Sequence, residues 1–197
     1  TAQLLHRLIL KERTGHLATL RGGAPMASMT LYLPAPDFSA FHVHVSRLAW
    51  HTQDMAQDAR VALSIAEADD GRADPFTLKR ISIRGKAEQL AGEQPDLKQQ
   101  WLVLFPQQAI NFELADFSFW RIAPTDARCG WPARPWRYGR RAAWRRFAAR
   151  HAGRQAGRIG RGEAAARLPR RACRASGPVR GRRDRCGRRA SRNWRRH

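Results

Sequence analysis

The segment FHVHVSRLAWHTQDMAQDARVALSI, residues 41–65, carries the pattern that decides the fold. Residues 41–46 alternate between apolar and polar side chains, which is typical of a half-buried β-strand. Residues 48–57 lack Gly and Pro and are helix-like. The alternation returns over residues 61–65. The segment therefore predicts a strand, a short helix and a second strand.

The chain before this segment predicts a helix followed by a hairpin. Residues 2–13 place Leu residues and Ile9 at helical spacing. Residues 17–20 and 26–33 are predicted strands that flank a Gly22-Gly23 turn. In the second of these strands Ser28, Thr30 and Tyr32 share one face, which we interpret as facing solvent or as lining a cavity.

The chain after the segment predicts two more strands and one helix. Residues 80–85 alternate, and Gly85 indicates a bulge or bend. Pro95 is a suitable first residue for a helix that Pro106 would close. Residues 116–123 form the last predicted strand, with Phe117 and Phe119 on one face.

Six short strands with hairpin-scale connections favour a mainly β protein built on an antiparallel barrel. The sequence contains no GxGxxG turn and no P-loop, so dinucleotide and nucleoside-triphosphate binding lose their usual support.

Charge divides the chain into two parts. The formal net charge is +21, yet residues 1–128 contain 14 basic and 14 acidic residues. Residues 129–197 contain 23 Arg, no Lys and only two acidic residues. We therefore predict a domain over residues 1–128 and an Arg-rich tail over residues 129–197.

Two hypotheses account for the tail. Its Arg, Gly, Ala and Trp composition without apolar periodicity is typical of an out-of-frame translation of GC-rich coding sequence, which would make it a non-native extension. The alternative is an Arg/Trp arm that binds nucleic acid or anionic lipid through guanidinium–phosphate contacts and stacking. Under either hypothesis like charges and few aliphatic residues predict a disordered segment.

The junction between the strand at 41–46 and the helix at 48–57 is the strongest candidate for a ligand site. Hydroxyls and backbone N–H groups gather there beside Arg47 and His51, an arrangement that suits a phosphate monoester. The alternative is that Ser46 caps the helix and that His51 is a surface or dimer-contact histidine.

Other polar positions carry weaker signals. Arg80, Arg84 and Lys86 could meet a phosphate or simply be solvated. His42 and His44 share a strand face, but no third ligand is evident, so ordinary surface histidines are favoured over a metal site and we predict no bound metal. No Ser-His-Asp arrangement or pair of catalytic carboxylates is recognisable, and the catalytic residues stay unassigned.

Five sequence motifs, taken in their order along the chain, resemble the FMN-binding split-barrel family. They are GHLATL (15–20), GAPMASMTLY (23–32), SRLAWHTQDM (46–55), DARVALSI (58–65) and RISIRGKA (80–87). Within it the chain is most similar to the pyridoxamine 5'-phosphate oxidase-related proteins and their bacterial haem-utilisation (HugZ-type) branch. The resemblance implies a six-stranded antiparallel Greek-key split barrel that forms a homodimer, with FMN between the subunits.

The resemblance also implies site residues. Ser28 and Thr30 would face the flavin, Ser46, His51 and Thr52 would hold its phosphate, and Arg80 would approach from a neighbouring strand. His51 stands where many members have Lys, and Ser28-Met29 where the oxidase has Arg, so a weaker phosphate affinity is expected. The oxidase also ends in a segment that bears Arg and His for its substrate and has no matching form here, so activity on pyridoxamine phosphate is not expected.

These features favour an FMN-dependent oxidoreductase or flavin carrier acting on a small-molecule substrate. The alternative is a haem-binding protein on the same barrel, with His42, His44 or His51 as contacts; a third is nucleic-acid binding through the tail. Residues 1–128 contain no Cys, and no apolar stretch or leader layout is present, so we expect a cytoplasmic protein without membrane contact.

Overall fold

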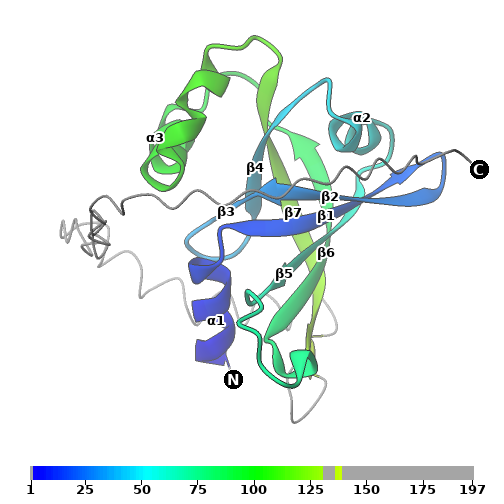
Figure 1. Ribbon diagram of the computed structural model, residues 1–197. Helices are drawn as coiled ribbons and strands as arrows, with labels where there is room; N and C mark the ends of the chain where they lie inside the picture. Colours follow the sequence, from blue (N-terminus) through cyan, green and yellow to red (C-terminus); the bar gives the residue numbers. More distant parts are fainter. Residues whose placement is uncertain (1, 131–135, 139–197) are drawn as a thin grey trace, which may run out of the picture. The chain divides into compact units, whose positions relative to one another are not determined.

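The computed structural model describes residues 2–130 and 136–138, which form a mainly β domain with a few helices (Figure 1). Its helices are α1 (Ala2–Lys11), α2 (Trp50–Gln57) and α3 (Pro95–Leu104), with short 3-10 helices η1 (Pro75–Thr77) and η2 (Pro106–Phe112). Its strands are β1 (Thr14–Arg21), β2 (Ala24–Leu31), β3 (Leu33–Pro34), β4 (Phe41–Ser46), β5 (Arg60–Ala66), β6 (Arg80–Gln89), β7 (Phe117–Gly130) and β8 (Trp136–Tyr138).

The strands form one curled antiparallel sheet in the order β2-β1-β5-β6-β7-β4-β3, with β8 paired to β7. β5, β6 and β7 are consecutive and β4 lies beside β7, which is a Greek-key order. The structure describes eight strands where the sequence predicted six. The prediction missed β3 and β8, because two or three residues carry no detectable alternation.

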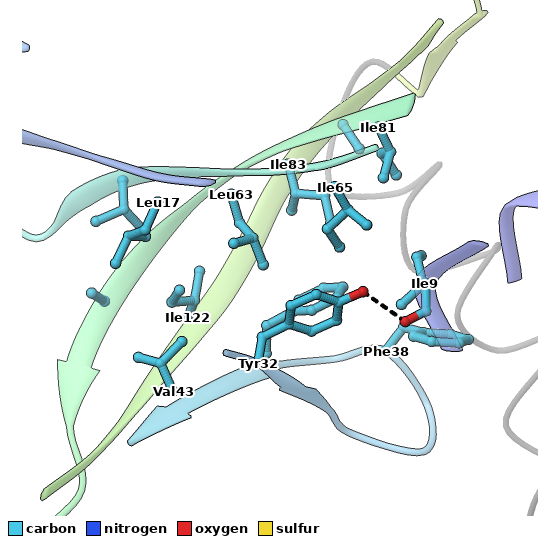
Figure 2. Close-up of a cluster of buried hydrophobic side chains, with 14 of the residues drawn as sticks. Ile9, Leu17, Tyr32, Phe38, Val43, Leu63, Ile65, Ile81, Ile83 and Ile122 are labelled. Carbon is cyan, nitrogen blue, oxygen red and sulfur yellow. Dashed lines mark hydrogen bonds between the residues drawn. The ribbon is translucent and has the colours of Figure 1, made fainter. Parts of the chain in front are cut away.

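The inner face of the sheet holds the main core (Figure 2). Aliphatic residues from neighbouring strands meet there in register, as in Leu17 opposite Leu63 and Leu63 opposite Ile83. Tyr32 is 1 % exposed, and its hydroxyl lies 2.8 Å from the Ile9 carbonyl of α1, to which it donates. Burial raises the pKa of Tyr32, and this buried phenol ties α1 to the barrel.

The orientation of β2 corrects the sequence interpretation. Thr30 and Tyr32 point inward and are buried, whereas Met29, on the apolar face, is 66 % exposed. Tyr32 therefore belongs to the core and does not face solvent, although it also borders a groove beside α1. Alternation assigns residues to two faces, but the neighbouring strands decide which face is covered.

A bulge interrupts the pairing of β6 and β7, as Gly85 suggested. The register shifts between Arg84 and Gly85, and Thr125 Oγ1 donates to the Arg84 carbonyl at 3.1 Å. A Cβ on Gly85 would lie 2.6 Å from the Ala123 carbonyl oxygen, so only glycine fits this close approach.

A second apolar cluster lies on the outer face of β4 and β7, under α3 (Figure 1). It contains Leu33, Trp101, Phe105 and Phe119, and Trp101 is 1 % exposed. The predicted helix between Pro95 and Pro106 is thus confirmed, and its aromatic residues cover the sheet.

β7 continues past residue 128, where the tail was predicted to begin. Cys129 is buried in the main core, and burial raises the pKa of its thiol to about 12. The predictions for the rest of the tail, apart from Gly130 and β8, fall outside the described residues. None of the helices described in the structure is both long and apolar enough to cross a membrane.

Candidate functional site

The N-terminus of α2 is uncapped. Its N-cap residue, Ala49, has no side-chain hydrogen bond to the helix. The amides of Thr52 and Gln53 both donate to the Ala49 carbonyl, at 3.1 and 3.2 Å. In the part of the chain that the structure describes, the amides of Trp50 and His51 have no acceptor. Two free N–H groups at the positive end of a helix are suited to an anion.

Ser46, at the end of β4, shapes the turn that leads into this helix. Its hydroxyl oxygen accepts the Leu48 amide at 3.0 Å, and its hydroxyl donates to the Asp116 carboxylate. Ser46 lies three residues before the N-cap, so the alternative that it caps the helix is wrong. Because its hydroxyl hydrogen is already donated to Asp116, Ser46 stabilises the shape of the turn.

His51 and Thr52 bring polar atoms without partners to the first turn of α2. Thr52 is 4 % exposed, and neither its Oγ1 nor His51 Nε2 has a hydrogen-bond partner among the described residues. Burial lowers the pKa of His51, and nearby Asp54 partly opposes this. Buried polar atoms normally have partners, so these two point to a missing ligand or water.

Asp54 fastens α2 to the end of β1. It is 2 % exposed, accepts the Thr19 hydroxyl at 2.8 Å and lies 2.9 Å from Arg21 Nε in an ion pair. The Arg21 guanidinium also lies over the Trp50 ring, 4.5 Å from its centroid, and donates to the Trp50 carbonyl at 3.2 Å. Sequence reasoning missed this network, since nothing local marks Thr19 and Asp54 as partners.

Ser28 and Thr30 lie on the inward face of β2, at the edge of the sheet. Thr30 is buried and Ser28 half-buried. β3 pairs Leu33 with His42 and Pro34 with Phe41. β2 itself pairs Ser28 with Leu17 and Thr30 with Gly15 of β1. The fold thus brings Ser46, His51 and Thr52 together at one junction, whereas Ser28 and Thr30 lie along β2.

Leu48 and Trp50, at the α2 turn, are exposed apolar residues. They are 70 and 60 % exposed, and Met29 on the outward face of β2 is 66 % exposed. Large apolar residues that stay exposed together are typical of a surface that another molecule covers.

Arg80 lies at the opposite end of β6 from α2. β6 pairs Lys86 with Arg60, just after α2, and Arg80 with Ala66, so six residues or roughly 20 Å of strand separate Arg80 from that end. Its Nη1 donates to the carbonyls of Phe76 and Leu78, at 3.1 and 3.3 Å. Within one subunit Arg80 does not join the other predicted site residues.

His42 and His44 are half-buried rather than surface residues. His44 stacks on Phe112 with centroids 4.1 Å apart and also contacts the rings of Trp101, Phe117 and Phe119. Burial and nearby Lys98 lower the pKa of His44 to about 4, and burial also lowers the pKa of His42. Among the residues described, no three His, Cys, Asp or Glu side chains are grouped to hold a metal ion.

Solved structures provide matches where sequence comparisons do not, since no protein-family profile and no curated protein matches the chain. A haem-binding protein from Mycobacterium smegmatis superposes with a TM-score of 0.63 at 25 % identity. The match covers 74 % of this chain and 60 % of that protein, so it spans less than two thirds of the relative.

Two further structures match with lower identity. An FAD-binding protein from Mesorhizobium loti matches with a TM-score of 0.51 and 21 % identity over 64 % of this chain and 90 % of that one. A Listeria innocua protein named after pyridoxamine 5'-phosphate oxidase matches with 0.52 and 15 % identity, covering 65 % and 96 % of the two chains. The chain therefore has the split-barrel fold of pyridoxamine 5'-phosphate oxidase-like proteins.

Proposed function

We propose that this split-barrel protein binds FMN, with the phosphate at the N-terminus of α2, and works as a flavin-dependent oxidoreductase on a small molecule. The observation that carries the proposal is the uncapped first turn of α2. It combines two free amides with the unpartnered Thr52 Oγ1 and His51 Nε2. A structural neighbour that binds FAD supports a flavin on this fold.

Each residue at this end would have a distinct task. The amides of Trp50 and His51 and the Thr52 hydroxyl would donate to phosphate oxygens, and a protonated His51 would add a charge. Ser46 would hold the turn, while Ser28 and Thr30 would face the flavin ring from β2. The Asp116 carboxylate, which accepts the Ser46 hydroxyl, would favour a ligand seated on the α2 side of the turn. Bound FMN would supply the electron chemistry, and the chain would bind and orient it.

Affinity for FMN measured against riboflavin tests the phosphate site, because the two ligands differ only in the phosphate. We expect the full-length protein to bind FMN more tightly. We expect Thr52→Val and His51→Gln to weaken FMN binding by roughly tenfold each without changing riboflavin binding, since a hydrogen bond to a charged group contributes about 1.5 kcal/mol.

Matched exposed positions provide the controls. Thr14→Val and His16→Gln, both on β1, leave both affinities unchanged. Equal affinity for FMN and riboflavin would contradict the proposal that the phosphate binds at this site. Equal losses of affinity for both flavins in the α2 variants would contradict it as well.

A homodimer is the second part of the proposal. Leu48 and Trp50 leave exposed apolar surface at the α2 turn, and Met29 leaves more on the outward face of β2; a second subunit that covers them would complete the flavin slot. Arg80, remote from α2 in its own subunit, could reach a flavin only from such a partner. In sedimentation we expect a dimer that Met29→Lys weakens. Phe76→Lys, at a residue 79 % exposed on η1, serves as the control and leaves the dimer intact. A monomer that binds FMN would contradict this part alone.

Haem is the alternative ligand, favoured by the Mycobacterium smegmatis haem-binding structure. His42, His44 and His51 each carry a ring nitrogen without a described partner, so each offers a contact. The absorption spectrum of the purified protein decides between the two ligands. A Soret band would support haem, and near-ultraviolet and blue flavin bands would support FMN.

A further inference from the structure

A second concave site lies away from the α2 turn, between α1 and α3. These helices occupy different parts of the domain's surface and flank the segment around β3 (Figure 1). The groove has a volume of about 940 Å³, within the range of ligand pockets. Residues at helical spacing line both walls, including Arg7, Leu10 and Lys11 from α1 and Val103 and Leu104 from α3.

The groove is distinct from the α2 site. Its floor contains Leu33 and Pro34, which pair with the first residues of β4, whereas Ser46 and the α2 turn lie at the other end of that strand. Five residues of strand, or roughly 16 Å, separate the two levels. A ligand in the groove therefore leaves the amides of α2 free.

The end of the groove beside Arg13 is apolar. Val103 is 78 % exposed, Leu10 41 % and Leu104 36 %, although all three line the same concavity. Arg13 closes this end, since its guanidinium donates to the Leu104 carbonyl and lies 5.5 Å from the centre of the Phe105 ring. An apolar chain or ring placed here would cover side chains that are otherwise in water.

The α1 wall beside this apolar end is basic. Arg7, Lys11 and Arg13 all line the groove, against the acidic Glu12 and Asp96. Lys11 lies 3.9 Å from Glu12, while Arg7 forms no ion pair with any described residue. Asp96 sits in the first turn of α3, where the helix dipole offsets its charge. Arg7 is thus the basic group best placed to meet an acidic ligand.

We propose that the groove binds a small amphipathic anion, with an apolar body against Leu10, Val103 and Leu104 and an acidic group at Arg7. The proposal is independent of FMN binding. Charge favours this ligand over the chain's own C-terminal segment. Residues 129–197 carry 23 Arg and only two acidic residues, so the basic α1 wall of the groove would repel them.

Fluorescence titration of the full chain with anilinonaphthalene sulfonate, in the presence of saturating FMN, tests the site. We expect saturable binding that decanoate displaces at least tenfold more effectively than decanol. Val103→Asp should weaken binding by at least tenfold, whereas Phe76→Asp, an equally exposed apolar position outside the groove, should not change it.

The charge reversal Arg7→Glu isolates the role of the acidic group. It should weaken decanoate binding threefold to tenfold and leave decanol unchanged, whereas Lys86→Glu on β6 should have no effect on either. Absence of saturable binding would mean that the groove stays empty or is filled by protein, and would overturn the proposal. So would insensitivity to Val103→Asp, or equal displacement by decanol and decanoate.

Discussion

Two half-buried histidines show how the same side chain behaves in two surroundings. His51 lies in the first turn of α2, and His44 lies under α3. Burial lowers the pKa of both rings, and each has a ring nitrogen without a described partner. His51 lies beside Asp54 and free helix amides, in a turn held by hydrogen bonds and an ion pair. His44 lies among aromatic rings, with Lys98 as its charged neighbour.

The difference separates a candidate binding end from a packing end. Asp54 favours the protonated form of His51, so an arriving phosphate would find a histidine able to accept a proton. Lys98 disfavours protonation of His44, which therefore stays neutral and packs as an aromatic ring. A depressed pKa alone thus does not identify a ligand site; the neighbouring charges decide.

Replacing Trp101 should have the largest effect, because α3 depends on packing. We expect Trp101→Ala to lower the free energy of unfolding by about 3–5 kcal/mol in urea titrations. Val103→Ala, on the exposed face of the same helix, should change it by less than about 0.5 kcal/mol. The ratio of FMN to riboflavin affinity should not move in either variant. A change in that affinity ratio would show that packing under α3 and phosphate binding at α2 are not independent.

Removing Asp54 should affect stability and binding together. Asp54→Ala leaves Arg21 and Thr19 without their buried acceptor, and we expect a loss of about 2–3 kcal/mol, since Arg21 remains partly solvated. The FMN to riboflavin affinity ratio should fall as well, because α2 is no longer held against β1. Asp58→Ala, in an exposed pair with Arg60, should leave the urea midpoint and the ratio unchanged. An Asp54→Ala protein with wild-type phosphate preference would contradict this link.

Acid should destabilise the α3 end through His44. Its pKa is about 4 in the folded state and 6.5 ordinarily, so the unfolded chain binds more protons between these values. The contribution is therefore present above pH 6.5 and is lost as pH falls towards 4. We expect roughly 2 kcal/mol after allowance for solvent screening. Urea titrations from pH 4 to 7 should show a smaller pH dependence in His44→Phe. Identical slopes in the two proteins would refute this assignment.

Replacing Trp50 should have the smallest effect on subunit stability. Trp50 is 60 % exposed, and Trp50→Ala removes its contact with Arg21, which is worth about 0.5–1 kcal/mol. The loss in free energy of unfolding should be measured at several protein concentrations. A loss that grows with concentration would show that Trp50 contacts a second subunit, whereas a constant loss would confine its role to the Arg21 contact.

The two ends also differ in how much the sequence reveals. The strand, helix and strand of residues 41–65 follow from alternation and the lack of Gly and Pro, and β4, α2 and β5 confirm them. The face that β2 presents to the core could not be predicted, because Met29 and Thr30 alternate equally well in either orientation. The Thr19–Asp54 bond joins residues 35 positions apart and leaves no local pattern.

The aromatic cluster around His44 was hidden for a different reason. His42 and His44 look like a solvent-facing row when β4 is viewed alone, and only the return of the chain through α3 covers them. The placement of Ser46, His51 and Thr52 at one junction was predictable, because they lie within seven residues of one another. Their roles in binding FMN stay predictions.

The irregular step at Gly85 has a consequence for the parity of β7. On its C-terminal side the odd-numbered Ala127 and Cys129 point into the barrel, and on its N-terminal side the even-numbered Trp120 and Ile122 do so. The extra residue changes the parity of the inward positions and keeps both halves of β7 on the same core. Deleting Thr125 would restore strict alternation with these four residues still directed inward, so the domain should tolerate this deletion better than a deletion elsewhere in β7, which would turn the inward residues of one half outward.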